Sequence, residues 1–192
     1  MLAAGRGSRL EGSTPKPLLE FRGRPLVRWA LDAAQQSGCS PVVLVVGHKA
    51  GKVAAAAPQG VNIAPARRWR RGIARSLRAA LTELEGWAQV QAVCIGLADQ
   101  PLVGAQAYRR LAAAHADGAE LAVATYDGQR GNPVLLARSL WPEASMLDGD
   151  EGARVLMRTH TPVEVPCDGT GDPGDVDTLE DLKRLEQEAG NL

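Results

Sequence analysis

The chain of 192 residues alternates strand-like and helix-like segments, which predicts an α/β fold of three layers with a mostly parallel sheet. Uninterrupted apolar runs at residues 42–46 and 92–98 are typical of strands buried on both faces of a parallel sheet. Between such runs, apolar residues recur at helical spacing, and each parallel crossover needs a helix. The length favours one domain over residues 1–192.

In the first part of the chain, helices and strands follow a glycine-rich opening. Pro25 suits the first turn of a helix, because its missing N–H would be unsatisfied there, and Gly38 suits a left-handed cap after it. The elements expected here are helices over residues 25–37, 49–57 and 73–84 and strands over residues 42–46 and 61–64.

The second part continues the same alternation. Asp150 is a suitable N-cap for one of its helices, and the glycines and aspartates of residues 168–177 predict a loop before a closing helix that opens at Thr178. The other expected elements are strands over residues 92–98, 121–125, 134–136 and 163–165 and helices over residues 105–115, 140–147 and 151–160.

Composition excludes several classes of protein. A formal net charge of zero argues against a non-specific nucleic-acid binder. There is no apolar run of about eighteen residues and no signal-peptide pattern, so we expect a cytoplasmic protein without a membrane partner. Cys39, Cys94 and Cys167 lie far apart in sequence without a Cys-x-x-Cys pair, which supports neither a disulfide framework nor a zinc site. We expect them to be reduced and buried.

The opening residues 1–10, MLAAGRGSRL, have the character of an anion-binding loop. Their glycines allow a tight turn and close approach of the backbone to a ligand, and Arg6, Arg9 and Lys16 add positive charge. The spacing matches neither the P-loop nor the dinucleotide fingerprint. The alternative is an exposed glycine-rich turn whose basic residues are merely solvated.

Two further stretches carry charged residues that are candidates for ligand binding. Asp99 leaves a central strand, and ligands of open α/β sheets lie at the carboxyl ends of the strands, so Asp99 is a candidate metal ligand. The alternative is a turn aspartate before the helix that starts near Gly104. The basic stretch over residues 67–72 is a weak signal for nucleic acid in a neutral chain; a loop near a phosphorylated ligand and a solvated surface are the other interpretations.

Six motifs together carry a resemblance to a known family. The chain resembles the MobA-like NTP transferases, most closely the molybdenum cofactor cytidylyltransferases, whose L-A-A-G-x-G-x-R…P-K opening it shares. The other motifs are GIARSL at 72–77, GLADQP at 96–101, RGNPV at 130–134, GDEGAR at 149–154 and DVDT at 175–178. In three places the chain departs from the pattern: Asn132 replaces a histidine, Arg75 stands where serine is common, and residues 14–17, TPKP, look more like sugar-phosphate nucleotidyltransferases.

The resemblance implies a Rossmann-like nucleotidyltransferase fold and in-line attack of an acceptor phosphate on the α-phosphorus of a nucleoside triphosphate, releasing pyrophosphate. In the catalytic group it assigns Lys16 to the α-phosphate, Arg9 to the β- and γ-phosphates, and Asp99 to Mg²⁺. Asp177 is the second expected Mg²⁺ ligand and Asp175 the reserve ligand.

The resemblance also divides the remaining site residues between two ligands. The residues expected to contact the nucleotide, besides Arg9, Lys16 and Asp99, are Leu2, Ala3, Ala4, Gly5, Gly72 and Ser76. Those expected to contact the acceptor are Arg130, Gly131 and Asn132.

The expected partners are CTP or GTP and a phosphorylated pterin or other small phosphate acceptor, and the resemblance leaves open a molybdoenzyme or chaperone as a protein partner. Guanylyl transfer to the pterin and nucleotidyl transfer to a sugar phosphate remain alternatives. A nucleotide-binding regulatory or chaperone-like module is the non-enzymatic alternative. Lys16 with two aspartates argues against that module, because a pure binder needs no transition-state cation.

Overall fold

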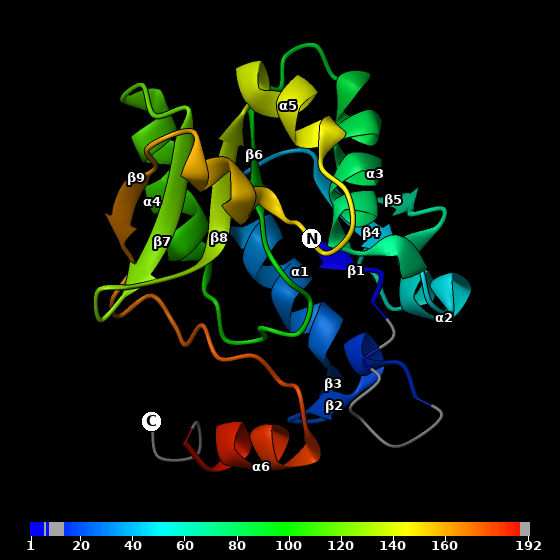
Figure 1. Ribbon diagram of the computed structural model, residues 1–192. Helices are drawn as coiled ribbons and strands as arrows, with labels where there is room; N and C mark the ends of the chain where they lie inside the picture. Colours follow the sequence, from blue (N-terminus) through cyan, green and yellow to red (C-terminus); the bar gives the residue numbers. More distant parts are fainter. Residues whose placement is uncertain (6, 8–13, 189–192) are drawn as a thin grey trace.

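The computed structural model describes residues 1–5, 7 and 14–188, and most of its strands form two sheets joined edge to edge, with a separate two-stranded hairpin beside them (Figure 1). The first sheet is parallel, in the order β1-β4-β5: β1 (Leu2–Ala3), β4 (Val42–Val46) and β5 (Val61–Pro65). The second has the order β6-β8-β7-β9: β6 (Ala92–Ile95), β7 (Leu121–Tyr126), β8 (Gln129–Ala137) and β9 (Val163–Pro166). A parallel bridge between Leu2 and Leu97 connects them.

Strand direction separates the two sheets. β9 lies parallel to β7 at the edge, whereas β8 runs antiparallel to both β6 and β7. Asp127 and Gly128 form the tight turn between β7 and β8, and both have positive φ (49° and 72°), as a two-residue hairpin connection requires. β8 is also much longer than the strand expected over residues 134–136, because it pairs with β7 from the turn onward.

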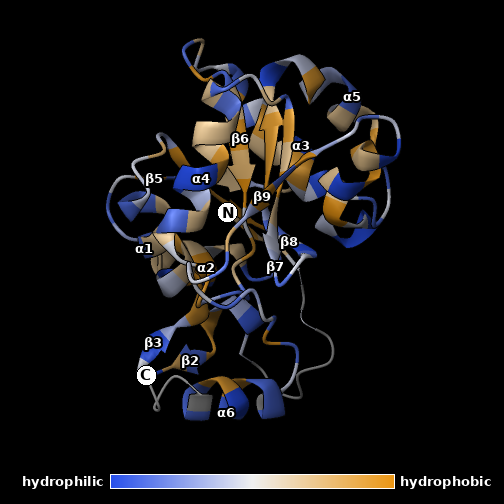
Figure 2. Ribbon diagram, turned by 90° about the vertical axis from the view of Figure 1, so that its left-hand side faces the viewer, coloured by the Kyte–Doolittle hydropathy of each residue, from blue (hydrophilic) through white to orange (hydrophobic). Residues whose placement is uncertain are grey.

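Helices cover both faces of the sheets, which confirms the α/β architecture. The helices are α1 (Leu26–Gln36), α2 (Ala50–Ala55), α3 (Ile73–Glu85), α4 (Ala105–Ala116), α5 (Trp141–Met146) and α6 (Leu179–Glu188). Alternate residues of β4 enter different cores: Val43 and Val45 pack with α3, whereas Leu44 and Val46 pack with α1 and α2. This explains why β4 is apolar throughout, and Figure 2 shows the apolar strands inside the polar helix surfaces.

The helix expected over residues 151–160 with Asp150 as its N-cap is not formed, and this prediction is wrong. A 3₁₀ helix (Ala153–Arg158) stands there, and it follows the extended Gly152. The chain before it is held by another element, because the N–H of Ala74 donates to the carbonyl of Gly149 at 3.2 Å. Asp150 lies in the loop so formed, outside any helix.

α6 packs away from the main sheets, against the hairpin of β2 (Glu20–Phe21) and β3 (Arg24–Pro25), as both ribbon views show. The small core between them contains Phe21, Leu26, Val176 and Leu185. This packing anchors the end of the 168–177 loop, which the structure confirms as irregular. None of the helices that the structure describes combines the length and apolar composition needed to cross a bilayer.

Candidate active site

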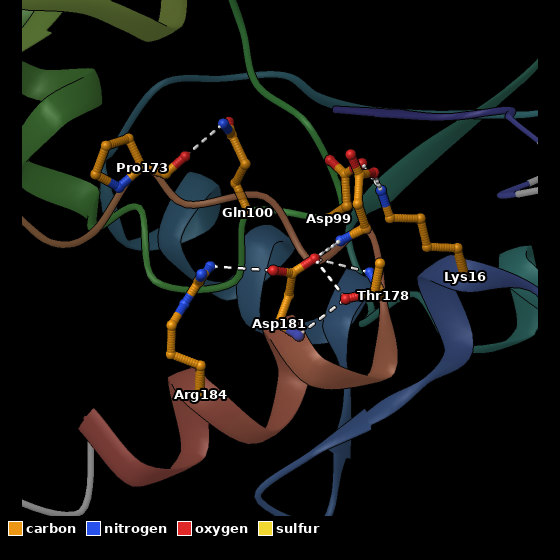
Figure 3. Close-up of polar contacts among 8 residues, drawn as sticks. Lys16, Asp99, Gln100, Pro173, Thr178, Asp181 and Arg184 are labelled. Atoms are coloured by element: carbon orange, nitrogen blue, oxygen red, sulfur yellow. Dashed lines mark hydrogen bonds and ion pairs between the residues drawn. The ribbon is translucent and has the colours of Figure 1, made fainter. Parts of the chain in front are cut away.

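Three charged side chains from distant segments converge on one point (Figure 3). The ammonium Nζ of Lys16 donates to Oδ2 of Asp99 at 2.5 Å and to Oδ1 of Asp177 at 2.6 Å. The Lys16 side chain is 10% exposed, and those of Asp99 and Asp177 are 26% and 42% exposed. The cluster is therefore open to solvent from the aspartate side.

Local structure places each of the three side chains. Lys16 opens a short 3₁₀ helix (Lys16–Leu18), and Asp99 follows β6. Asp177 directly precedes the capping residue of α6: the N–H groups of Asp177 and Thr178 donate to Oδ2 of Asp181 at 3.1 and 2.8 Å, and the N–H of Asp181 donates to the Thr178 hydroxyl at 3.1 Å. This reciprocal arrangement has the form of a capping box.

A backbone bond ties the two aspartate segments together. The N–H of Val176 donates to the carbonyl of Asp99 at 2.9 Å, so the loop before α6 is fixed to the turn after β6. Gln100 adds a second tie, because its buried side chain donates to the carbonyl of Pro173 at 2.7 Å (Figure 3). The carboxylates of Asp99 and Asp177 are thus positioned by two structured segments rather than by free loops.

The charges at this cluster influence one another. Burial disfavours the charged form of Lys16, but Asp99 and Asp177 outweigh it and raise the pKa of the ammonium above its ordinary value. Loss of water around the carboxyl of Asp175, and then the negative charge of Asp99, raise the pKa of Asp175. The site consequently holds a firmly charged cation beside three acidic groups.

A pocket of about 480 Å³, which we call the polar pocket, opens beside this cluster. It lies at the carboxyl ends of β1 and β6, where open α/β sheets bind their ligands. Its lining comprises Leu2, Ala4, Gly5, Trp69, Arg70, Gly72, Ile73, Ser76, Leu97, Asp99 and Asp150. Most of the expected nucleotide contacts are in this set. Two described ones are not: Ala3 packs in the core with α1, and Lys16 lies beside the pocket, where it donates to Asp99.

Gly72 is required by the geometry of the polar pocket. It has φ of +106°, and a Cβ there would lie 1.9 Å from the carbonyl oxygen of Gly149. A side chain of α3 also holds the loop that carries Gly149, because the Arg75 guanidinium donates a hydrogen bond to the Asp148 carboxylate at 2.8 Å. The arginine that departs from the family's common serine therefore anchors a wall of the pocket.

A second pocket of about 320 Å³, which we call the apolar pocket, shares a rim with the first. Its lining comprises Leu2, Ile73, Leu77, Ile95, Leu97, Asn132, Val134, Asp150, Gly152, Ala153, Arg154, Val155 and Asp175. Both pockets have Leu2, Ile73, Leu97 and Asp150 in their walls. Two ligands could therefore meet across this shared rim, within reach of Asp99 on one side and Asp175 on the other.

The structure separates the three residues expected at the acceptor. Asn132 is 8% exposed and lines the apolar pocket, and its carbonyl accepts from the Tyr126 hydroxyl at 2.9 Å. Arg130 is not part of that lining and forms an ion pair with Glu164 at 2.7 Å. Gly131 lies under the Tyr126 ring, which a Cβ would approach to 3.1 Å.

The remaining candidate residues are the arginines of the opening loop and residues of the basic stretch and the GDEGAR motif. Arg9 and Arg6 lie outside the described residues. Trp69, from the basic stretch, lines the polar pocket with its ring 5.4 Å from that of His48 and the Arg70 guanidinium 5.0 Å from its centre. Sequence reasoning missed Asp150 and Arg154 as pocket residues, although both lie in the GDEGAR motif.

The donor set of the cluster suits a hard divalent cation. Asp99 and Asp177 direct oxygens at a single positive charge, and Mg²⁺ and Mn²⁺ favour a few carboxylates completed by substrate phosphates and water. Within the described part of the chain, no group of three or more His, Cys, Asp or Glu side chains is arranged as a complete metal site. The described side chains would thus supply only part of a metal's ligands, and phosphate oxygens of a substrate or water are suited to complete the set.

Comparison with known protein families gives a clear result. Residues 1–165 match the model of the MobA-like NTP transferase domain. The chain belongs to this family. It is a nucleotidyltransferase of the MobA-like type, and the divalent metal and nucleoside triphosphate that the family uses agree with the charged cluster and the adjoining polar pocket.

Several similar solved structures cover nearly the whole chain. The crystal structure of Rv0371c from Mycobacterium tuberculosis is 33% identical, with a TM-score of 0.84 over 97% of this chain and 95% of that chain. A complex of Rv0371c with manganese is 32% identical, with a TM-score of 0.81 over the same shares. Molybdopterin-guanine dinucleotide biosynthesis protein A from Archaeoglobus fulgidus is 17% identical, with a TM-score of 0.71 over 100% of this chain and 97% of that chain, and shows the fold alone.

Curated relatives have diverse names. Nicotine blue oxidoreductase from Paenarthrobacter nicotinovorans is 34% identical over 96% of this chain and 94% of that protein. Bifunctional protein GlmU from Trichlorobacter lovleyi is 38% identical over 65% of this chain, and the match spans only 27% of that longer protein. The family is thus shown by the model that matches residues 1–165, while the names of the curated relatives point to different activities and substrates.

Proposed function

We propose that this protein transfers a nucleoside monophosphate from a nucleoside triphosphate, CTP in the first instance, to the phosphate of molybdopterin or its molybdenum-loaded form, with Mg²⁺ as the metal and pyrophosphate as the second product. The observation that carries the proposal is the convergence of Lys16, Asp99 and Asp177 beside two pockets with a common rim. The choice of CTP and of the pterin rests on the motif resemblance.

In the proposed reaction the polar pocket takes the nucleotide. Its wall of Leu2, Ala4 and Gly5 brings backbone close to the base and ribose, and the glycine of the 72–76 turn leaves room for the ligand. Lys16 binds the α-phosphate oxygens, where negative charge develops, and Arg9 extends the positive charge to the β- and γ-phosphates.

Asp99 and Asp177 would hold the Mg²⁺, with Asp175 in reserve; when bound, this ion would neutralise phosphate charge. The two carboxylates now share the Lys16 ammonium, so their engagement by another cation would release Lys16 for phosphate. The raised pKa of Lys16 keeps the released ammonium charged at neutral pH.

The apolar pocket takes the acceptor. Its aliphatic walls suit a flat heterocycle, while Asn132 and Arg154 supply the polar contacts that orient it. Asp150 lies in both pockets and sits between the two ligands. We place Asn132 at the acceptor and expect Arg130 and Gly131 to support its strand rather than to bind the ligand.

Pyrophosphate release tests the proposal directly. The protein is mixed with Mg²⁺, one of CTP, GTP or UTP, and either molybdopterin or a sugar 1-phosphate, with the exposed-lysine variant Lys52→Ala as a matched control of integrity. We expect release only with CTP and molybdopterin. Release with GTP and the pterin would move the proposal to guanylyl transfer, and a nucleotide that binds without reacting would favour the regulatory or chaperone-like module.

Two relatives suggest further substrates to include in this assay. The GlmU identity over 65% of the chain and the TPKP run favour a sugar-phosphate acceptor as second candidate, and release with the sugar 1-phosphate would support it. Nicotine blue oxidoreductase motivates an arm with nicotine blue and a reduced nicotinamide cofactor. Bleaching of the dye without any pyrophosphate release would contradict nucleotidyl transfer.

A further inference from the structure

Two cysteines that the sequence separates by more than fifty positions meet in the folded protein. Cys39 lies in the turn between α1 and β4, and Cys94 lies on β6, yet both line the same cavity and each thiol shifts the pKa of the other. Both pack at the edge of the same apolar core, under α4. The expectation that all three cysteines are buried is wrong for this pair, since both are partly exposed and only Cys167 is fully buried.

The pair faces a cavity that a small oxidant can enter. Cys39 and Cys94 both line a cavity of about 80 Å³ between β4 and β6, at the end of the sheet where these strands begin. One water needs only about 10–15 Å³ of such space, so a molecule the size of hydrogen peroxide fits. The cavity therefore brings a peroxide within reach of two sulfurs at once.

The surroundings of Cys39 favour its thiolate. The neighbouring thiol of Cys94 lowers the pKa of Cys39 to about 6 against the opposing effect of burial. The positive charge of the Arg109 guanidinium acts in the same direction as Cys94. Arg109 is fixed nearby, because it donates to the carbonyl of Gln36 at 2.6 Å.

Cys94 has the opposite character. The neighbouring Cys39 and burial both raise the pKa of Cys94 well above the ordinary value, so Cys94 keeps its proton while Cys39 is ionised. The remaining charged or titratable groups on this side are the Met1 ammonium, whose pKa burial lowers to about 5, and the Tyr108 hydroxyl, whose pKa burial raises. Cys39 is thus ionised and can attack first, whereas Cys94 keeps its proton and can react second.

We propose that Cys39 and Cys94 form a peroxide-reactive dithiol, with Cys39 as the attacking thiolate and Cys94 as the resolving thiol. Cys39 attacks one peroxide oxygen, the O–O bond breaks, and the leaving hydroxide takes up a proton to become water. Cys94 then attacks the resulting sulfenic sulfur, an S–S bond forms, and the S–O bond breaks to release a second water with the Cys94 proton. The two thiols lose two electrons, which reduce one peroxide to two waters.

Mass spectrometry of the whole chain tests the pair. The reduced protein is treated with hydrogen peroxide at pH 7, blocked with an alkylating agent and digested with trypsin without reduction. We expect one cross-link within the chain, between the tryptic peptides 29–49 and 79–109, with Cys167 in peptide 159–183 still alkylated. A cross-link between two chains, or oxidation of Cys167 as fast as of Cys39, would overturn the proposal.

Variants separate the two roles. Cys94→Ser should let the sulfenic acid accumulate on Cys39, where dimedone traps it, and Cys39→Ser should slow peroxide consumption roughly tenfold. Cys167→Ser is the matched control and should cross-link like the native chain. Equal peroxide consumption by Cys39→Ser and the native chain would contradict the assignment.

The native chain offers a check that needs no variant. Alkylation of Cys39 should be half-maximal near pH 6, since the thiolate is the reactive form, whereas Cys167, whose pKa is raised by burial, should react only at higher pH. Coincident alkylation profiles for the two cysteines would remove the basis for an attacking thiolate. This test is independent of nucleotidyl transfer.

Discussion

The polar and apolar pockets share one rim and differ in what stands behind it. Leu2, Ile73 and Leu97 form the common wall, but the polar pocket continues to Asp99, Ser76 and Arg70, whereas the apolar pocket continues into aliphatic side chains. The polar pocket can therefore position the charged groups of a ligand, whereas the apolar pocket can select a ligand by its shape. Changes to the first should therefore alter rate and metal dependence, and changes to the second should alter acceptor affinity.

The largest effect is expected from the cation between the aspartates. Lys16→Ala should lower turnover by roughly 10²–10³-fold, the scale seen when one preorganised charge stabiliser is lost, because the Lys16 ammonium donates to both carboxylates. Steady-state pyrophosphate release measures it, with Lys52→Ala as the control. Turnover close to that of the control would show that Lys16 is only a structural ion-pair partner.

A smaller effect is expected at a metal ligand. Asp99→Asn keeps the size of the side chain but removes one of the two carboxylates that share the Lys16 ammonium. Mg²⁺ should therefore no longer tighten nucleotide binding, with a loss of at least roughly 10-fold in metal affinity, since removing even an outer-shell partner of a metal ligand costs that much. Calorimetric titration of CTP with and without Mg²⁺ measures it. If metal-dependent affinity is unchanged, Asp99 serves only as the partner of Lys16.

The apolar pocket should respond in affinity alone. Asn132→Ala should raise the KM for the acceptor by up to about tenfold, the cost of one neutral hydrogen-bonding side chain, and leave the KM for the nucleotide unchanged. Arg130→Ala is the matched comparison, because Arg130 pairs with Glu164 outside the pocket lining. An equal rise in both variants would mean that Arg130 also reaches the acceptor.

The smallest effect is expected at the reserve ligand. The folded state raises the pKa of Asp175, so ionisation of this carboxyl lowers the free energy of unfolding at pH values above its unfolded-state pKa of about 3.9. Below that pH the carboxyl is protonated in both states, and its titration does not change stability. Asp175→Asn should therefore stabilise the protein at pH 7 by no more than about 0.5 kcal/mol, and the gain should vanish near pH 3. Urea unfolding at the two pH values measures it; a gain that persists near pH 3 would contradict an origin in ionisation.

Much of the fold could be predicted from local patterns. The run of Val42–Val46 and the helical spacing after Ile73 are properties of neighbouring residues, and the structure confirms both elements. The helix over residues 151–160 failed because a tertiary contact, from the Ala74 N–H to the Gly149 carbonyl, holds the preceding loop. The antiparallel direction of β8 relative to β7 follows from the local Asp127–Gly128 turn, whereas its pairing with the distant β6 could not be predicted, because tertiary packing decides which distant strands pair.

The sequence by itself determined the residue types of the site: a lysine after a glycine-rich loop, an aspartate leaving a strand, and an aspartate before the last helix. Only the tertiary structure decided that Lys16 meets Asp99 and Asp177, which lie 83 and 161 positions away along the chain. It also decided that Asn132 and Arg130 face different surroundings and that Cys39 and Cys94 meet. The physical reason is that charge, size and periodicity are local properties of the sequence, whereas proximity is set by how the apolar faces of distant segments pack together.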